Sequence, residues 1–172
     1  MKEIRERLKI YENMYPFADK LNPKLHNEIM RIDDTLNKPK SVDAKMSEWR
    51  TKNDLFDIVI AFIGKHIEND FCIGGMTCSE CWGILCNNGD SIGVHNHQPA
   101  QLSFVYYVNT PKGSSPLVFD TSGYRVKAES GKIVIFDSRL NHHVPKNKCD
   151  GRSLISGNFI YGIGSGVYGL GY

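Results

Sequence analysis

The hydrophobic pattern of the chain changes near residue 70, and this change constrains the fold more than any other feature of the sequence. The first 70 residues hold 13 basic and 13 acidic residues but only one glycine, Gly64. The remaining 102 residues hold the other 15 glycines and four of the six histidines. Apolar residues recur at helical spacing before the change, and at a spacing of two or in short runs after it. The pattern predicts a helical first part followed by a strand-rich body, not two independent domains.

Three helices are predicted in the first part. The first runs from Ile4 through Leu8, Tyr11 and Tyr15 and ends at Pro16. The second begins at Asn22 and Pro23 and ends before Pro39, and the third extends from about Asn53 to about Asn69. Alternating apolar residues over 42–49 predict a short strand between the last two helices. Each helix has one apolar face, which we expect to pack against a sheet.

The second part of the chain predicts a β-sandwich or jelly roll. Glycine-containing turns separate seven expected strands, over residues 80–86, 92–95, 102–108, 117–120, 124–128, 133–136 and 154–161. The tail, residues 162–172, holds five glycines and is expected to have no packed structure of its own. The predicted organisation is one domain over 1–172, with a helical part (1–70), a jelly-roll core (71–161) and the glycine-rich tail.

Composition excludes several classes of protein. The net charge is +2 without a basic run, so nothing indicates nucleic-acid binding. The longest apolar stretch is far shorter than the about 20 residues that span a bilayer, and the N-terminus lacks an apolar signal core. We therefore expect a cytoplasmic protein that does not bind membranes. Five cysteines are expected to be free thiols; Cys78 and Cys81 have zinc-knuckle spacing, but no second pair follows.

The histidines are the residues of this sequence that most clearly indicate a chemical function. His95 and His97 are two residues apart, so in a strand both face the same side, as two metal ligands must. About 45 residues later an apolar strand leads into His142 and His143, and Arg152 lies ten residues past His142. Three protein ligands on one face of an iron ion leave three positions open for substrate and oxygen. An arginine one strand away can bind the distal carboxylate of a dicarboxylic co-substrate through two hydrogen bonds.

In this order of motifs, over about residues 80–160, the chain resembles the small Fe(II)/2-oxoglutarate-dependent oxygenases that are common in bacteria and tailed phages. The matching positions are Trp82, Gly89 and Asp90, then His95, His97, Ser103, Tyr106 and Tyr107, and finally Phe136, Leu140, His142, Val144 and Arg152. The resemblance implies a double-stranded β-helix, cupin-like, with helices packed on its outer face. It also implies host cytoplasm as the location if the protein is phage-encoded.

The same resemblance implies roles for particular residues. His95 and His142 would bind iron, and Arg152 would bind the 5-carboxylate of 2-oxoglutarate. Tyr106 or Tyr107 could add a hydroxyl to that carboxylate, although only one of these neighbours can face inward. Ser103, which belongs to the same motif, is a further candidate for co-substrate binding.

The third ligand departs from the family pattern. The wider superfamily usually has a carboxylate two residues after the first histidine, whereas this chain has His97. We expect His97 to be the ligand, with Asp90 and Asp137 as the nearby carboxylates that could replace it or support it. His143 is expected to point away from the metal because adjacent strand residues face opposite sides.

The predicted function is an Fe(II)- and 2-oxoglutarate-dependent dioxygenase that uses O2 to hydroxylate a C–H bond and releases succinate and CO2. A protein or peptide side chain, by analogy with prolyl hydroxylases, is the preferred substrate, with a small molecule as another possibility. Two alternatives stay open: a cupin-like three-histidine dioxygenase without 2-oxoglutarate, and a non-enzymatic jelly-roll binding module. The sequence does not indicate an oligomeric state.

Overall fold

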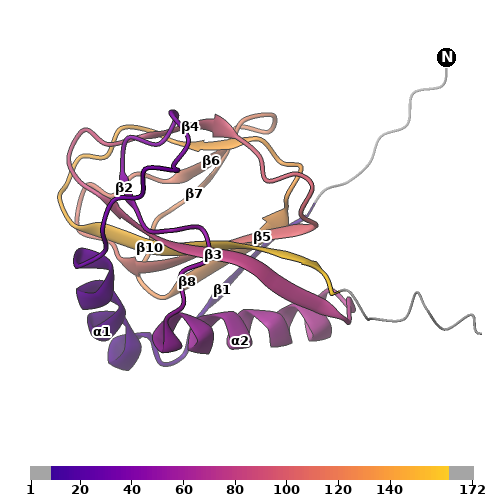
Figure 1. Ribbon diagram of the computed structural model, residues 1–172. Helices are drawn as coiled ribbons and strands as arrows, with labels where there is room; N and C mark the ends of the chain where they lie inside the picture. The colour runs from indigo at the N-terminus through magenta and orange to yellow at the C-terminus, as the bar shows by residue number, and fades with distance from the viewer. Residues whose placement is uncertain (1–8, 163–172) are drawn as a thin grey trace, which may run out of the picture.

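A computed structural model describes residues 9–162 of the chain (Figure 1). Within this range, two helices and ten strands follow one another in the order β1 (Ile10–Met14), α1 (Ala18–Met30), β2 (Lys45–Met46), α2 (Asp54–Asp70), β3 (Met76–Cys86), β4 (Ile92–His95), β5 (Leu102–Asn109), β6 (Leu117–Phe119), β7 (Tyr124–Val126), β8 (Lys132–Asp137), β9 (His142–Val144) and β10 (Arg152–Tyr161).

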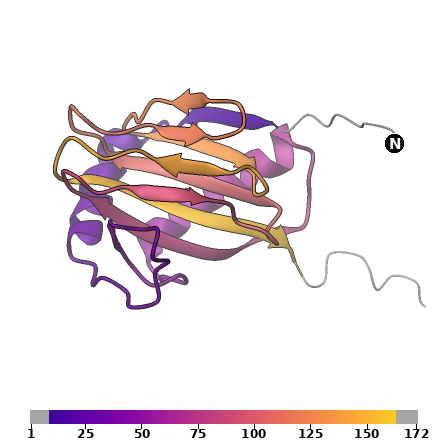
Figure 2. The same ribbon diagram turned by 90° about the horizontal axis from the view of Figure 1, so that it is seen from above.

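The strands form two antiparallel sheets that face each other. The six-stranded sheet has the order β1-β8-β5-β10-β3-β2, and the four-stranded sheet has the order β4-β9-β6-β7. Both helices lie against the larger sheet, on the face away from the smaller one (Figures 1 and 2). This architecture confirms the predicted double-stranded β-helix with helices on its outer face.

The larger sheet has an apolar core on each side because its side chains alternate between the two faces. On β5, Phe104 and Tyr106 join the core beneath the helices, whereas Val105 and Tyr107 join the core between the sheets. Leu25 of α1 and other helix residues close the first core. The second core surrounds the cavity that contains the candidate site.

The first predicted helix is wrong over the part that the structure describes. Residues Ile10–Met14 form β1, an edge strand that pairs with β8. Tyr11 and Tyr15 are four residues apart, which suits one face of a helix. Because four is an even number, the same spacing also places both rings on one face of an extended chain. Both rings pack against the helix-side core. Residues 1–8 lie outside the described range.

The second helix differs in its bounds, whereas the third is confirmed. Helix α1 begins at Ala18, contains Pro23 and ends at Met30, well before Pro39. The buried stripe of Leu21, Leu25 and Ile29 fixes it against the sheet, so packing outweighs the local proline signal. Helix α2 begins where expected, because the side chain of Asn53 accepts hydrogen bonds from the first-turn amides.

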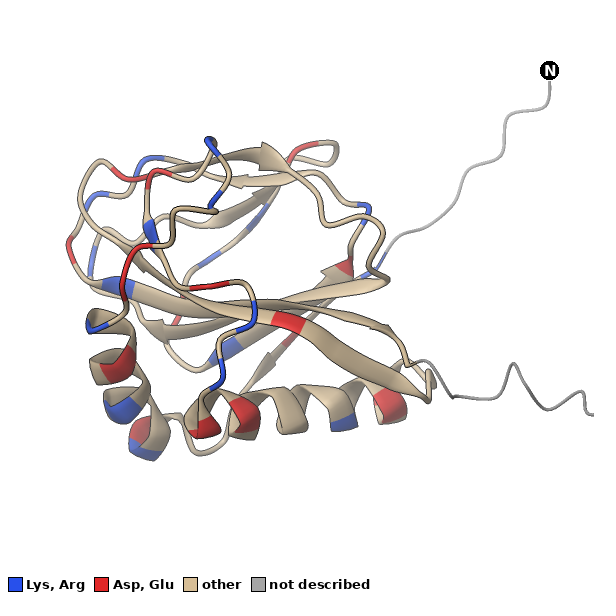
Figure 3. Cartoon of the chain, viewed as in Figure 1, with Lys and Arg blue, Asp and Glu red and all other residues tan. Residues whose placement is uncertain are grey.

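Charged residues are spread over the helices and loops in the view of Figure 3, with basic and acidic positions interspersed. Among residues 9–162, no helix is long and apolar enough to cross a membrane.

All five cysteines are free thiols, as expected, and burial raises the pKa of Cys78 to about 11 and that of Cys81 to about 12. The predicted tail lies outside the described residues from position 163 onward.

Candidate metal centre and buried arginine pocket

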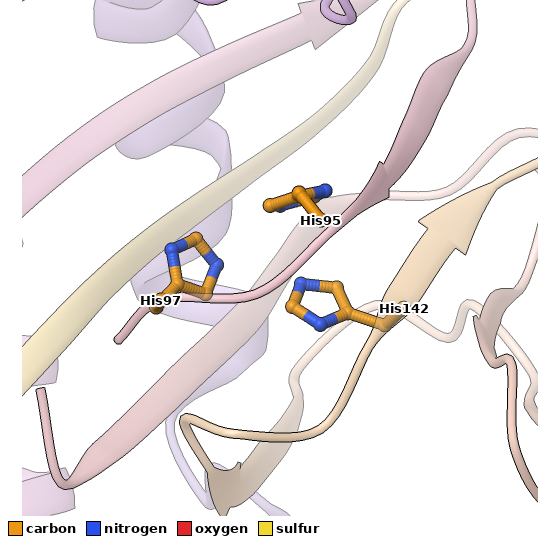
Figure 4. A group of neighbouring side chains, drawn as sticks. All are labelled: His95, His97 and His142. Carbon is orange, nitrogen blue, oxygen red and sulfur yellow. The ribbon is translucent and has the colours of Figure 1, made fainter. Parts of the chain in front are cut away.

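Three histidines converge where β4 ends and β9 begins, in the smaller sheet. His95 is the last residue of β4, His142 is the first of β9, and these two residues are opposite each other in the strand register. His97 lies in the loop that follows β4. Figure 4 shows the three rings turned toward one another, and one ligand atom from each lies within 4.8 Å of the others. The arrangement can hold one metal ion on a single face.

Backbone carbonyls orient two of these rings. Nδ1 of His95 lies 2.8 Å from the carbonyl oxygen of Gly93, and Nδ1 of His142 lies 2.8 Å from that of Leu140. A carbonyl oxygen only accepts, so each Nδ1 carries the proton and donates. The lone pair of each neutral imidazole is therefore on Nε2, where a metal can bind it.

The histidines are neutral near pH 7. Burial lowers the pKa of His97 to about 3, with further repulsion from His142 and His95. Burial, together with His95, lowers the pKa of His142 to about 4, and burial lowers that of His95 as well. A cluster that stays unprotonated is ready for a metal ion, because a protonated imidazole cannot coordinate.

A cavity of about 140 Å³ extends from the histidines into the core between the sheets. Its walls are mostly apolar and include Ile84, Ile92, Leu117, Val144 and Leu154. Arg152 also lines this cavity and is 0% exposed. Its Nη1 donates to Sγ of Cys86 at 3.2 Å, while Nε and Nη2 find no partner within residues 9–162.

Tyr107 lies beside this arginine. Cζ of Arg152 is 5.4 Å from the centre of the Tyr107 ring, and the buried hydroxyl of Tyr107 likewise has no partner in the described chain. Unpaired donors on a buried cation are costly, so a ligand that accepts from them is strongly favoured. The two-pronged geometry of a guanidinium matches a carboxylate. The cavity thus suits a small carboxylic acid that also reaches the histidines.

Two other predicted co-substrate residues lie elsewhere. Tyr106 faces the helices, where its hydroxyl donates to Oδ1 of Asn22, so of the two neighbouring tyrosines only Tyr107 reaches the cavity. Ser103 shares the inward face of β5, but it is bonded to Ser138 and Asn158 and does not line the cavity. Strand parity explains the position of Tyr106, as expected for one of two neighbouring tyrosines, and Ser103 lies near the start of β5, before the cavity-lining Val105 and Tyr107.

The remaining predicted alternatives can also be placed. His143 turns away from the cluster and pairs with Asp120. The carboxylate of Asp137 is held by Arg139, with Nη2 and Oδ2 2.8 Å apart, and that of Asp90 accepts from the amide of Asn87 at 2.7 Å. Within residues 9–162, neither carboxylate joins the group of potential ligand atoms.

The sequence analysis missed the surroundings of the site. An open cleft of about 750 Å³ adjoins the cavity and shares Trp49, Asn96 and His97 with it. Trp49 packs edge-on against Trp82, with ring centres 4.8 Å apart. Cys86 is opposite Arg152 in the register of β3 and β10, which no local signal reveals. These residues become visible only once the strand pairing is known.

Comparisons with known proteins agree with this geometry. Residues 80–126 match the family model described as "Putative 2OG-Fe(II) oxygenase", where 2OG is 2-oxoglutarate. No curated protein matches the chain.

The solved structures that are similar in fold include the three described next. The viral collagen prolyl hydroxylase vCPH from Paramecium bursaria Chlorella virus-1, in a 2OG complex, has a TM-score of 0.70 at 13% identity, covering 87% of this chain and 94% of its own. A prolyl-4-hydroxylase from Pseudomonas putida has a TM-score of 0.69 at 18% identity, covering 90% and 94%. The non-heme alpha-ketoglutarate-dependent epimerase SnoN from nogalamycin biosynthesis has a TM-score of 0.71 at 11% identity, covering 90% and 77%. The family match covers residues 80–126, a little over a quarter of the chain, and the similar solved structures share its overall fold.

Proposed function

We propose that the protein is an Fe(II)- and 2-oxoglutarate-dependent dioxygenase that hydroxylates a C–H bond of a peptide or protein side chain, with proline as the first candidate. The observation that carries this proposal is the buried Arg152, whose unpaired donors lie in the same cavity as three convergent histidines. The cavity has a buried cation at one place and a candidate metal site at another. This arrangement suits a ligand that has a carboxylate at one end, for the cation, and metal-binding oxygen atoms at the other end.

The residues present fit both iron and 2-oxoglutarate. His95, His97 and His142 would hold the metal through neutral imidazoles, and Arg152 with Tyr107 would bind the distal carboxylate of the co-substrate. When bound, iron and 2-oxoglutarate supply the oxidative chemistry for an unactivated C–H bond. The chain itself would bind and orient these groups and exclude water, since the cavity is small and most of its wall is apolar.

The open cleft supports the choice of substrate. It reaches His97, and its apolar border includes Trp49, Pro99, Ala100 and Ile160. An open cleft of this volume can admit a peptide segment while one of its side chains points toward His97. The names of two similar structures, a collagen prolyl hydroxylase and a prolyl-4-hydroxylase, support proline as the first residue to test.

The test is an aerobic assay with Fe(II), 2-oxoglutarate and proline-containing peptides, read as succinate release and as the gain of one oxygen atom by the peptide. Matched peptides with alanine in place of proline are the control. Succinate that depends on the proline peptide supports the full proposal, whereas oxygen gained equally by the alanine peptides would refute prolyl specificity.

Binding measurements separate the alternatives. Metal binding without any 2-oxoglutarate binding would indicate a three-histidine dioxygenase that does not use this co-substrate. Binding of neither metal nor 2-oxoglutarate would indicate a non-enzymatic binding module.

A further inference from the structure

A chain of buried polar side chains crosses the larger sheet beside the metal centre. Oγ of Ser103 lies 2.7 Å from Oγ of Ser138, and the Ser103 hydroxyl also bonds to Oδ1 of Asn158 at 2.9 Å. Nδ2 of Asn158 donates to Oε2 of Glu80 at 3.1 Å. Ser103 and Ser138 are 0% exposed and Asn158 is 4% exposed, in a protein interior that is otherwise mostly apolar.

One end of this chain of side chains meets the loop that carries His97, and the other end lies in the wall of the open cleft. At one end, the carbonyl oxygen of Ser138 accepts a hydrogen bond of 2.9 Å from the backbone amide of His97. At the other end, Glu80 and Asn158 line the open cleft. The chain therefore connects the loop that carries His97 to the wall of the proposed substrate cleft.

His97 needs support that the other two histidines do not. His95 and His142 lie in paired strands, and each ring is fixed by a backbone carbonyl. His97 follows the end of β4, and its ring lies 5.7 Å from that of Trp82, centre to centre, but within residues 9–162 it has no counterpart to the carbonyl hydrogen bonds that fix the other two rings. The position of its imidazole therefore depends on how firmly the loop backbone is held.

Packing alone does not require these polar groups. Buried hydroxyl and amide groups cost free energy to desolvate, and apolar side chains of similar volume would fill the same space. A fully bonded polar network instead fixes one geometry, because each group has a definite partner and direction. We infer that Ser103, Ser138 and Asn158 are positioning residues that hold the loop of His97 at the metal centre, an inference that rests on the proposed role of His97 as a ligand.

The test is titration with Co(II) alone, which reports both affinity and, through its visible absorption, the ligand geometry. Ser103→Ala and Ser138→Ala each remove one hydroxyl of the pair. The control is Ser153→Ala, because Ser153 is also a 0% exposed serine but bonds to Nδ1 of His26 at 2.8 Å, in contact with helix α1. Thermal unfolding of every variant monitors the loss of stability that any buried serine can cause.

We expect Ser103→Ala and Ser138→Ala to weaken Co(II) binding about 10-fold or more and to alter the spectrum, since loss of outer-shell partners costs roughly 10–100-fold in metal affinity. Ser153→Ala should keep the wild-type affinity and spectrum. Wild-type Co(II) binding in both Ser103→Ala and Ser138→Ala would overturn the inference, and so would equal weakening in all three variants.

A separate variant distinguishes failure of this inference from failure of the ligand assignment. Unchanged Co(II) binding by His97→Ala would refute the proposed ligand itself, and with it the need for positioning. Weakened binding by His97→Ala, together with wild-type binding by Ser103→Ala and Ser138→Ala, would refute only the positioning role.

Discussion

Arg152 offers the most direct test of the co-substrate pocket. Its guanidinium is fully buried, one nitrogen donates to Cys86, and Nε and Nη2 have no partner in residues 9–162. If these donors bind the distal carboxylate of 2-oxoglutarate, then Arg152→Ala removes the charge and both hydrogen bonds at once. The three histidines lie at another part of the cavity wall, so their affinity for metal should change little.

The expected loss follows from the burial of this pair. Losing one partner of a buried, hydrogen-bonded charge pair costs on the order of 2–5 kcal/mol. Since about 1.4 kcal/mol corresponds to a factor of ten, affinity for 2-oxoglutarate should fall by roughly 30-fold to several thousand-fold. Arg152→Met should show a similar loss while filling much of the space that alanine leaves empty, which limits the cavity cost to stability.

The assay is calorimetric titration of 2-oxoglutarate into Mn(II)-loaded protein, for wild type and both variants, with Mn(II) affinity measured separately. Thermal unfolding gives an independent measure, because a ligand at about 100 times its Kd stabilises the folded state by roughly 2.7 kcal/mol. Wild type should gain this stabilisation and the variants should not at the same concentration. Equal affinities in wild type and Arg152→Met would refute the assigned role of this arginine.

Three further predictions concern single side chains. His142→Ala should abolish Co(II) binding whereas His143→Ala should leave it within a few-fold of wild type; the opposite pattern would show that the ligand assignment is off by one residue. His97→Asp should still bind Fe(II) under anaerobic conditions, because it recreates the common carboxylate ligand set, whereas His97→Ala should bind Fe(II) more weakly. Equal Fe(II) affinity in wild type and His97→Ala would count against His97 as the third ligand. Tyr107→Phe should weaken 2-oxoglutarate binding about 3–10-fold, as expected for one hydrogen bond of roughly 0.5–1.5 kcal/mol, without changing metal affinity. Tyr106→Phe should instead leave 2-oxoglutarate affinity unchanged. It should lower the free energy of unfolding by about 1–3 kcal/mol, since the buried side chain of Asn22 on α1 loses its hydrogen-bond donor. An equal loss of 2-oxoglutarate affinity in both tyrosine variants would contradict the assignment of the two rings to opposite faces of the sheet.

Much of the site could be predicted because its signals are local. His95 and His97 are two residues apart, and His142 follows an apolar run that forms β8, so chain order alone indicated a cluster. Helix α2 was predicted correctly because its apolar period and its Asn53 cap lie within one segment. Such patterns need no knowledge of what lies on the other side of the fold.

Other features depend on contacts between distant segments. Residues Ile10–Met14 form a strand because β8 presents an edge to them, although their own spacing also suits a helix. Likewise, the local pattern shows that Tyr106 and Tyr107 face opposite ways, but only the placement of the helices decides which ring reaches the cavity.

The sequence by itself determined the strand-rich body, the capped helix α2 and the residue types of the candidate metal centre, because hydrophobic period and short-range spacing are properties of single segments. Only the tertiary structure decided that Cys86 lies beside Arg152, that Ser103 bonds to Ser138 instead of lining the cavity, and that Trp49 borders both cavity and cleft. The physical reason is that strand pairing joins residues dozens of positions apart. Their register sets which side chains meet, and no local pattern records it.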